Sequence, residues 1–383
     1  MQNHQRLWAE INLDNLAQNV KIINNMIPKT SKFMAVVKAD GYGHGSLEVA
    51  KVCLYNGADI LGVAILDEGI HLRENNIPSE ILVLGYTESL RLSNIVKYDL
   101  TQTIFNKEMA QELNEHAKNL NKKAKIHIKI DTGLSRLGFL PSEMFMKDIE
   151  EIKNLPYIEI TGCYTHFAEA DSTDTYFTTE QYNKFIEVKK GLESIGLSGI
   201  CFHVSNSAAI LKFSDYSLDI SRAGIILYGL SPSPDIDVEK LGLLPVMSLK
   251  TRISNIKTLK KGVSVGYART FFTSHETVIA TIPVGYADGY ARANSNKGKV
   301  LVNGEYANII GRICMDQMMI DITNIKDVKP EDTVTLIGED DGQKIRADEI
   351  AQTIGTIAHE VVCAIGKRVP RVYIKNGQII KVV

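Results

Sequence analysis

Eight short apolar runs recur through the first two-thirds of the chain, and this repeat restricts the folds open to it. The runs are residues 33–38, 61–65, 81–85, 101–105, 126–130, 158–164, 200–204 and 218–220. Amphipathic stretches separate them: in residues 13–27, Leu16, Val20 and Ile23 recur at helical spacing, and residues 179–195 form another such stretch. Eight strand–helix units over about 220 residues predict a TIM-type (β/α)8 barrel. A doubly wound sheet is the alternative, but it rarely needs eight strands.

The pattern changes near residue 240. Alternating apolar residues and turn dipeptides, such as Lys261-Gly262 and Asn303-Gly304, dominate from there onward. We therefore expect an α/β protein with a barrel over residues 12–240 and a mostly-β domain over residues 241–383. Residues 1–11 are expected to form a strand that joins the second domain.

Composition and charge argue against several classes of protein. The 383 residues are 44% hydrophobic, with a formal net charge of −2 and no Lys/Arg-rich tract, so we expect no nucleic-acid or membrane partner. The sequence opens without a signal-peptide pattern and contains no apolar run that could span a bilayer, which favours a cytoplasmic protein. The five cysteines are scattered without CxxC spacing, which predicts reduced thiols and no metal site.

The stretch FMAVVKADGYGHG places a lysine at the end of the first apolar run. Most lysines are solvated, so a surface position is the ordinary interpretation. Lys38, however, follows a wholly apolar run, and the carboxyl ends of barrel strands form the active-site face. A lysine desolvated there loses its proton more readily and can act as an amine nucleophile. Gly41 and Gly43 would let the loop turn sharply, so that Tyr42 points into the barrel mouth.

Two loops near the end of the predicted barrel could hold a phosphate group. Ser207 lies in HVSNSAAI, and Gly224 and Ile225 lie in SRAGIILYGL. Barrels often bind phosphate at the loops after their last two strands, although such loops can also serve packing alone. A lysine after the first strand, combined with a phosphate site at the last two, indicates pyridoxal 5'-phosphate.

The sequence resembles the alanine racemase family from end to end. The resemblance rests on the ordered motifs AVVKADGYGHG, KIDTGLSRLG, HFAEAD, HVSNSAA, RAGIILYG, VGYART, PVGYADGY, GRICMDQMMIDIT and RVPRVY. It implies a pyridoxal-phosphate-dependent isomerase with a small amino acid as substrate and a role in supplying D-alanine for cell-wall precursors. It also implies a homodimer in which each β domain contributes to the active site of the partner subunit.

The resemblance assigns two catalytic bases. Lys38 matches the lysine that forms a Schiff base with the cofactor, and Tyr267 matches the second base, to which His166 is expected to bond. Arg222 matches the arginine that faces the pyridine nitrogen, with His203 hydrogen-bonded to it. Racemisation takes a proton from one face of Cα and returns one to the other, so two bases on opposite faces suit it. The usual tyrosine pKa is near 10, so cationic neighbours would have to lower it for this role.

Further residues carry over to the cofactor and the substrate. Arg136 matches an arginine near the cofactor's phenolic oxygen and the substrate carboxylate, and Lys129 aligns with a lysine that is carbamylated in several relatives. Met315 matches the residue whose backbone N–H meets the substrate carboxylate, and Asp316 lies beside it. The remaining cofactor contacts and the substrate access channel are expected to involve Tyr42, Ser207, Gly224, Ile225, Lys367, Tyr286, Arg292 and Asp171.

The chain departs from the family pattern at two places. Lys367 stands where a tyrosine is expected to reach the phosphate, and Ala291 replaces a proline. An ammonium can keep the phosphate contact but leaves room beside the substrate side chain. Serine or another small amino acid is therefore the alternative substrate to alanine. A non-catalytic pyridoxal-phosphate carrier and a decarboxylase with the same cofactor are more remote alternatives.

Overall fold

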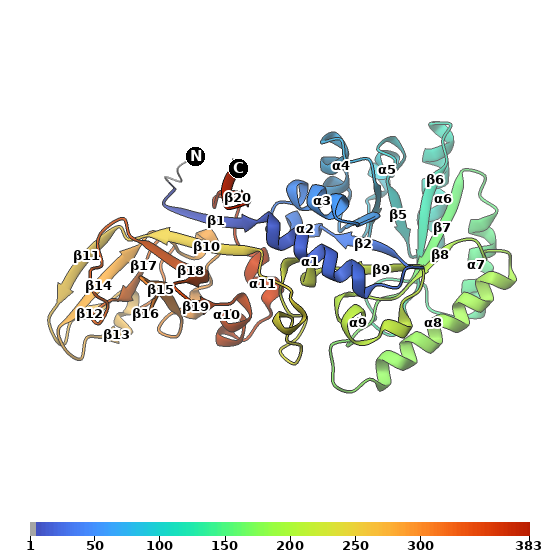
Figure 1. The fold of residues 1–383 in the computed structure, drawn as a ribbon. Coiled ribbons are helices and arrows are strands. Elements are labelled where there is room, and N and C mark those ends of the chain that lie inside the picture. The colour runs from blue at the N-terminus through green and yellow to red at the C-terminus, as the bar shows by residue number, and fades with distance from the viewer. Residues whose placement is uncertain (1–4) are drawn as a thin grey trace.

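The computed structural model describes residues 5–383 and consists of a parallel barrel followed by a β domain (Figure 1). The barrel strands are β2 (Lys32–Val36), β3 (Ile60–Val63), β4 (Glu80–Val83), β5 (Thr101–Ile104), β6 (Ala124–Lys129), β7 (Ile158–Tyr164), β8 (Cys201–His203) and β9 (Ile220–Ala223). They pair in the order β8-β7-β6-β5-β4-β3-β2-β9. The N–H groups of Asp219 and Arg222 donate to Phe202 O (2.9 Å) and Ser205 O (3.2 Å), so the barrel nearly closes. The predicted fold class, a TIM-type barrel before a mostly-β domain, is confirmed.

Helices with one apolar face cover the outside of the barrel. They are α1 (Leu13–Met26), α3 (Ser46–Tyr55), α4 (Leu66–Glu74), α5 (Leu92–Lys97), α6 (Lys107–Asn119), α7 (Glu143–Lys153), α8 (Tyr176–Ser194) and α9 (Ser207–Lys212). The helix predicted over residues 13–27 is α1, in which Leu16, Val20 and Ile23 are fully buried. No helix between residues 5 and 383 combines the length and the apolar character that a bilayer span requires.

The C-terminal domain is built on one large, mostly antiparallel sheet. Its strands pair in the order β11-β14-β17-β16-β15-β18-β10-β1-β20-β21, with β19 paired to β18. Their bounds are β1 (Leu7–Asn12), β10 (Met247–Arg252), β11 (Asn255–Leu259), β14 (Thr277–Ile282), β15 (Lys299–Val302), β16 (Glu305–Ile310), β17 (Met318–Asp321), β18 (Thr333–Asp340), β19 (Gln343–Ile345), β20 (Arg371–Lys375) and β21 (Gln378–Val382). The domain also contains a small sheet and two helices: β12 (Ser264–Val265), β13 (Phe271–Phe272), α10 (Ala347–Ile354) and α11 (Ala358–Cys363).

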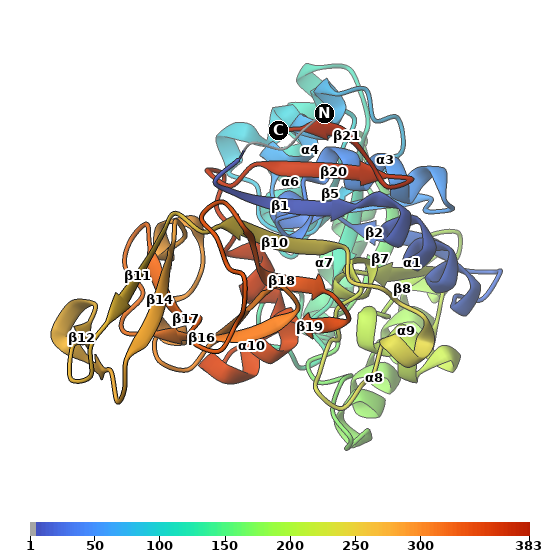
Figure 2. The ribbon, with the colours of Figure 1, turned by 60° about the vertical axis from the view of Figure 1, so that its left-hand side comes forward.

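Strand β1 belongs to this sheet although it precedes the barrel in sequence. It pairs antiparallel with β10, from Leu7 opposite Thr251 to Ile11 opposite Met247, and parallel with β20 on its other side. The chain then continues into α1 on the barrel, as both views show (Figures 1 and 2). The chain therefore passes between the two domains twice, once after β1 and once before β10.

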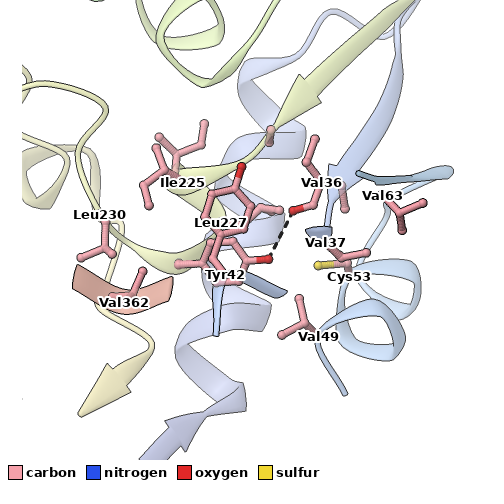
Figure 3. Packing of buried hydrophobic residues seen from close by; sticks show 14 of the residues in the cluster. Val36, Val37, Tyr42, Val49, Cys53, Val63, Ile225, Leu227, Leu230 and Val362 are labelled. Atoms are coloured by element: carbon pink, nitrogen blue, oxygen red, sulfur yellow. Dashed lines mark hydrogen bonds between the residues drawn. The ribbon is translucent and has the colours of Figure 1, made fainter. Parts of the chain in front are cut away.

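The C-terminal domain packs against the loop that follows β2. Arg371 Nε donates a hydrogen bond to Gly43 O (3.0 Å), and the other guanidinium nitrogens donate to carbonyls within residues 365–369. Gly43 has φ = 78°, and a Cβ at this position would lie only 2.4 Å from Val362 O of α11. Val362 and Tyr42 belong to one buried apolar cluster that runs through both domains (Figure 3). Both domains thus fix the position of this loop.

Replacing Gly43 with alanine should destabilise this contact. We expect Gly43→Ala to lower the free energy of unfolding by roughly 2–4 kcal/mol, because a left-handed alanine costs about 1–2 kcal/mol and the new Cβ would displace the backbone of α11. Denaturant unfolding curves would measure the loss. Gly377→Ala is the control, since Gly377 also has a positive φ of 70° but faces open space. Equal losses in the two variants would contradict the close approach.

Candidate active site

A cavity of about 550 Å³ opens at the carboxyl ends of the barrel strands. Its size lies within the ~300–1,000 Å³ that is usual for small-molecule sites. Many of the residues predicted from the sequence line it: Lys38, Tyr42, Lys129, Arg136, His166, Asp171, Ser207, Arg222, Gly224 and Ile225. These residues are far apart in sequence, and they converge because parallel strands of a barrel end at the same face.

Lys38 begins a left-handed turn at the end of β2. The turn, α2 (Lys38–Tyr42), contains Ala39, Asp40, Gly41 and Tyr42, which all have φ between 52° and 61°. Three of these residues carry a Cβ, for which the left-handed region costs free energy. Such a turn persists only where its surroundings hold it in place, and strained backbone of this kind concentrates at functional sites.

Side-chain hydrogen bonds hold the turn. Glu68 Oε1 accepts the N–H of Ala39 (2.6 Å), and Asp40 Oδ1 accepts the N–H of Ser46 (2.8 Å). His44 Nδ1 lies 3.0 and 2.9 Å from two carbonyl oxygens of the turn, so this nitrogen carries the proton and donates. The backbone that carries the lysine side chain is therefore held by three side chains.

The amine of Lys38 is largely buried and lies close to the charge of Arg136. Burial, and next the charge of Arg136, lower the pKa of Lys38 below its usual value. The carboxylate of Glu68 acts in the opposite direction. A lowered pKa raises the fraction of neutral amine, which is the form that attacks a carbonyl group or accepts a proton.

Arg222 lies on β9 and is almost completely buried at 3% exposure. Its Nη1 hydrogen-bonds His203 Nδ1 (2.8 Å), and its Nη2 donates to Thr165 O and Val204 O (2.9 Å each). Nη2 also lies 3.3 Å from His166 Nδ1. Burial lowers the pKa of Arg222 to about 10, so the guanidinium keeps its charge at neutral pH. Arg222 is a fixed cation whose direction is set by these four contacts.

Lys129, at the end of β6, is a second buried amine. It donates to Ile130 O (3.1 Å), and its Nζ lies 5.0 Å from the centre of the Tyr164 ring. Burial, followed by the charges of Arg222 and Arg136, lowers its pKa to about 7. About half of this amine is therefore neutral near pH 7.

Two hydroxyl groups meet beside a glycine at another part of the cavity wall. Ser207 Oγ accepts the N–H of Gly224 (2.8 Å). A Cβ on Gly224 would lie 2.7 Å from Tyr42 Oη, so only glycine leaves this recess open. Burial raises the pKa of Tyr42, and its hydroxyl therefore stays protonated and able to donate. A polar recess of this kind suits an anionic group.

The site residues predicted from the C-terminal domain lie elsewhere in the described chain. Tyr267 is 70% and Met315 is 53% exposed, and Asp316 pairs with Arg368 at 2.7 Å. Both ribbon views place β12, which precedes η5 (Tyr267–Arg269), at the end of the C-terminal domain away from the barrel (Figures 1 and 2). The following predicted residues are not in the cavity lining: Tyr267, Tyr286, Arg292, Met315, Asp316 and Lys367.

The cavity also contains residues that sequence reasoning missed. His359 and Ile357 reach it from the C-terminal domain, and the His359 ring lies 5.9 Å from the Tyr42 ring. Lys367 is exposed on the turn after α11 and is not among the residues that line the cavity. No local pattern marks His359, because only the packing of α11 against the barrel brings it there.

Two family models match the chain in sequence. The model of the alanine racemase N-terminal domain matches residues 11–232, and the model of the C-terminal domain matches residues 246–373. The alanine racemase of Clostridium novyi is 48% identical over 98% of this chain and 97% of its own length. That of Clostridium tetani is also 48% identical, with the same coverage.

Solved structures agree with these sequence matches. Alanine racemase from Clostridium difficile 630 superposes with a TM-score of 0.95 at 43% identity, over 100% of this chain and 99% of the other. The alanine racemase from Bacillus anthracis, solved with bound L-Ala-P, gives a TM-score of 0.94 at 37% identity, over 100% and 98% of the two chains. Because both domains match in sequence and in structure, the chain belongs to the alanine racemase family, whose members are isomerases.

Proposed function

We propose that the protein is a pyridoxal-phosphate-dependent racemase that interconverts L- and D-alanine with two bases, Lys38 and the partner subunit's Tyr267. The observation that carries the proposal is the amine of Lys38, whose pKa burial and Arg136 lower, at the end of a barrel strand and in a cavity of suitable size. Family membership supports the reaction and the choice of alanine, since the curated relatives at 43–48% identity are named alanine racemase.

The residues of the cavity fit pyridoxal phosphate. The hydroxyls of Tyr42 and Ser207 beside Gly224 would hold the phosphate group, Lys38 would hold the aldehyde carbon, and Arg222 would donate to the pyridine nitrogen. When bound, this cofactor withdraws electrons from Cα of the amino acid and makes its proton removable. Arg222 limits that withdrawal, because a guanidinium donates a hydrogen bond without giving up its proton. This weaker electron withdrawal favours return of the proton to Cα over transamination.

Lys38 and Arg136 would bind the substrate and move its proton on one face of Cα. The neutral amine of Lys38 takes or returns the proton on one face of Cα. Arg136 lines the same cavity and can pair with the substrate carboxylate through two parallel hydrogen bonds. Racemisation then needs a second base, on the opposite face.

The second base would come from another copy of the chain. Tyr267 is exposed in η5, where Ala268 and Arg269 hold left-handed φ angles of 58° and 51°. Met315 is another large apolar side chain left exposed in this domain. Large exposed side chains, one of them next to strained backbone, fit a surface that a partner covers, so we propose a homodimer with shared active sites.

Mixing two inactive variants tests the two-base proposal. Lys38→Ala and Tyr267→Phe should each abolish formation of D-alanine from L-alanine. After full subunit exchange, activity should return to about a quarter of the wild-type value, because half of the dimers are mixed and each mixed dimer has one intact site. Each variant exchanged with itself is the control. An inactive mixture, with exchange proven by native mass spectrometry, would place both bases in one chain or identify a different second base.

Substrate choice should depend on His359 and not on Lys367, because His359 lines the cavity. His359→Tyr should raise the ratio of kcat/KM for alanine over serine by roughly threefold to tenfold, since a larger ring leaves less room for the serine hydroxyl. Lys367→Tyr is the matched control and should leave the ratio unchanged. A shift in the Lys367 variant alone would restore Lys367 as the determinant of specificity.

Lys129 should make stability depend on pH. Its pKa is about 7 in the folded chain and about 10.4 when unfolded. Between these two pH values the unfolded state binds more protons than the folded state does. The free energy of unfolding therefore rises with pH, by up to about 1.4 kcal/mol per pH unit for this group. The contribution of Lys129 to stability is lowest below pH 7. Unfolding in carbon dioxide-free buffer should show this slope in the difference between the wild type and Lys129→Met.

The same amine is the proposed site of carbamylation. A neutral amine reacts with carbon dioxide, and a carbamate would place a negative charge beside Arg136 and Arg222. Labelled bicarbonate should therefore give a carbamate carbon signal in the NMR spectrum of the wild type and none in Lys129→Met. A spectrum without this signal at pH 8 would mean that Lys129 remains an amine.

A further inference from the structure

The charge of Arg222 is buried without a carboxylate among the contacts that the structure describes for it. Its hydrogen-bond partners are the carbonyls of Thr165 and Val204 and the Nδ1 atoms of His203 and His166. A buried charge is costly unless nearby groups compensate it. One of its partners, His203, continues into a series of groups that leads across the barrel to a carboxylate.

The proton positions in this series follow from Arg222, which can only donate. His203 Nδ1 must accept from Arg222, so His203 carries its proton on Nε2 and donates to His127 Nδ1 at 3.0 Å. His127 in turn carries its proton on Nε2, which lies 3.8 Å from Glu80 Oε1. Burial keeps both imidazoles neutral by lowering the pKa of His127 to about 3 and that of His203 well below its usual value. We call these four residues, Arg222, His203, His127 and Glu80, the relay.

Several features of the barrel accommodate the relay. Tyr164 stacks on His203 with ring centres 4.6 Å apart and planes 12° apart. A Cβ on Gly162 would lie 2.6 Å from the His127 ring, so glycine on β7 makes the space for this side chain. The register between β6 and β7 also shifts next to His127. The interior of a barrel is usually filled by branched aliphatic residues, and here part of that volume is given to two histidines.

The relay runs from the mouth of the barrel to its opposite end. Arg222 lines the cavity, whereas Glu80 is the first residue of β4, at the amino ends of the strands, with a side chain that is 34% exposed. If His127 and His203 only satisfied each other's hydrogen-bonding groups, no carboxylate would be needed at the far end of the relay. Glu80 Oε1 lies 3.8 Å from His127 Nε2, beyond hydrogen-bond distance, so Glu80 would act on the relay as a nearby negative charge. Such a charge would polarise the donors toward itself and strengthen the acceptor that Arg222 meets at His203.

We propose that His127 and Glu80 are positioning residues that hold the Arg222 guanidinium charged and directed for its contact with the cofactor. The proposal rests on the proposed function for the identity of that cofactor. Neither residue lines the cavity, so both act through His203 and Arg222. The proposal extends the active site through the barrel interior to its far end.

A double-mutant cycle tests whether Glu80 and His127 affect cofactor binding through one shared route, in which case the effects of the two substitutions do not add. The apo-protein would be titrated with pyridoxal phosphate and followed by cofactor absorbance, in the wild type, Glu80→Gln, His127→Phe and the double variant. We expect the dissociation constant to rise two- to fivefold in Glu80→Gln and roughly tenfold or more in His127→Phe. The double variant should match His127→Phe within twofold, because Glu80 acts only through His127. Additive losses would overturn the proposal.

Glu159→Gln provides the matched control. Glu159 is an exposed carboxylate near the start of β7, at the same end of the barrel as Glu80, and is outside the relay. It should bind the cofactor as the wild type does. If Glu80→Gln behaved like Glu159→Gln, the relay would have no role. Because Glu80 is partly exposed, this comparison stays decisive even if His127→Phe does not fold.

Nitrogen NMR of the apo-protein tests the relay without the cofactor. In the wild type, His203 and His127 should both carry their proton on Nε2 only, and the Nε2–H signal of His127 should shift in Glu80→Gln. The opposite tautomer on either ring, or a charged imidazole at neutral pH, would contradict the relay. A protein that shows these tautomers but binds no pyridoxal phosphate would instead contradict the proposed function.

Discussion

Four cations share the mouth of the barrel, and their burial and mutual repulsion determine which of them can react. Lys38 and Lys129 both have lowered pKa values, through burial first and then through the charge of Arg136 for Lys38 and of Arg222 and Arg136 for Lys129. The arginines cannot respond in the same way, because a guanidinium holds its proton far more strongly than an ammonium does. Arg136 and Arg222 are therefore fixed charges, whereas the two lysines lose their protons more readily than an exposed lysine does. The same excess of positive charge suits an anionic cofactor and a substrate carboxylate.

The position of Lys38 also depends on a strained backbone. A left-handed turn with three non-glycine residues is unfavourable by itself, and the contacts around it offset that cost. Glu68 holds the turn from the barrel, whereas Arg371 and the backbone of Val362 hold the following Gly43 from the C-terminal domain. The second domain is thus part of the site in its own chain, before any partner is considered.

The sequence predicted those features that depend on a local pattern of residues. Alternating runs and amphipathic stretches predicted the barrel, and an apolar run ending in a lysine predicted where Lys38 lies. His359, His127 and Glu80 were not predicted, because long-range packing alone brings them to the cavity or to Arg222. Lys367 shows the limit of an assignment made from a motif alone. It was placed at the cofactor by its position in a motif, yet the turn that carries it faces solvent.

The rigidity of the domain junction bears on where a second base could come from. Strand β1 is held in the C-terminal sheet by β10 and β20 and runs directly into α1 of the barrel, and Arg371 Nε bonds Gly43 O in the loop after β2. The two domains of one chain are therefore joined by the chain itself and by a contact between residues far apart in sequence. Figure 1 shows β12, the strand directly before η5 and Tyr267, at the end of the C-terminal domain away from the barrel. Bringing Tyr267 to Lys38 within one chain would require breaking the contacts between the two domains. A second copy of the chain can bring it there with the junction intact, which is the physical reason to expect shared active sites in a symmetric dimer.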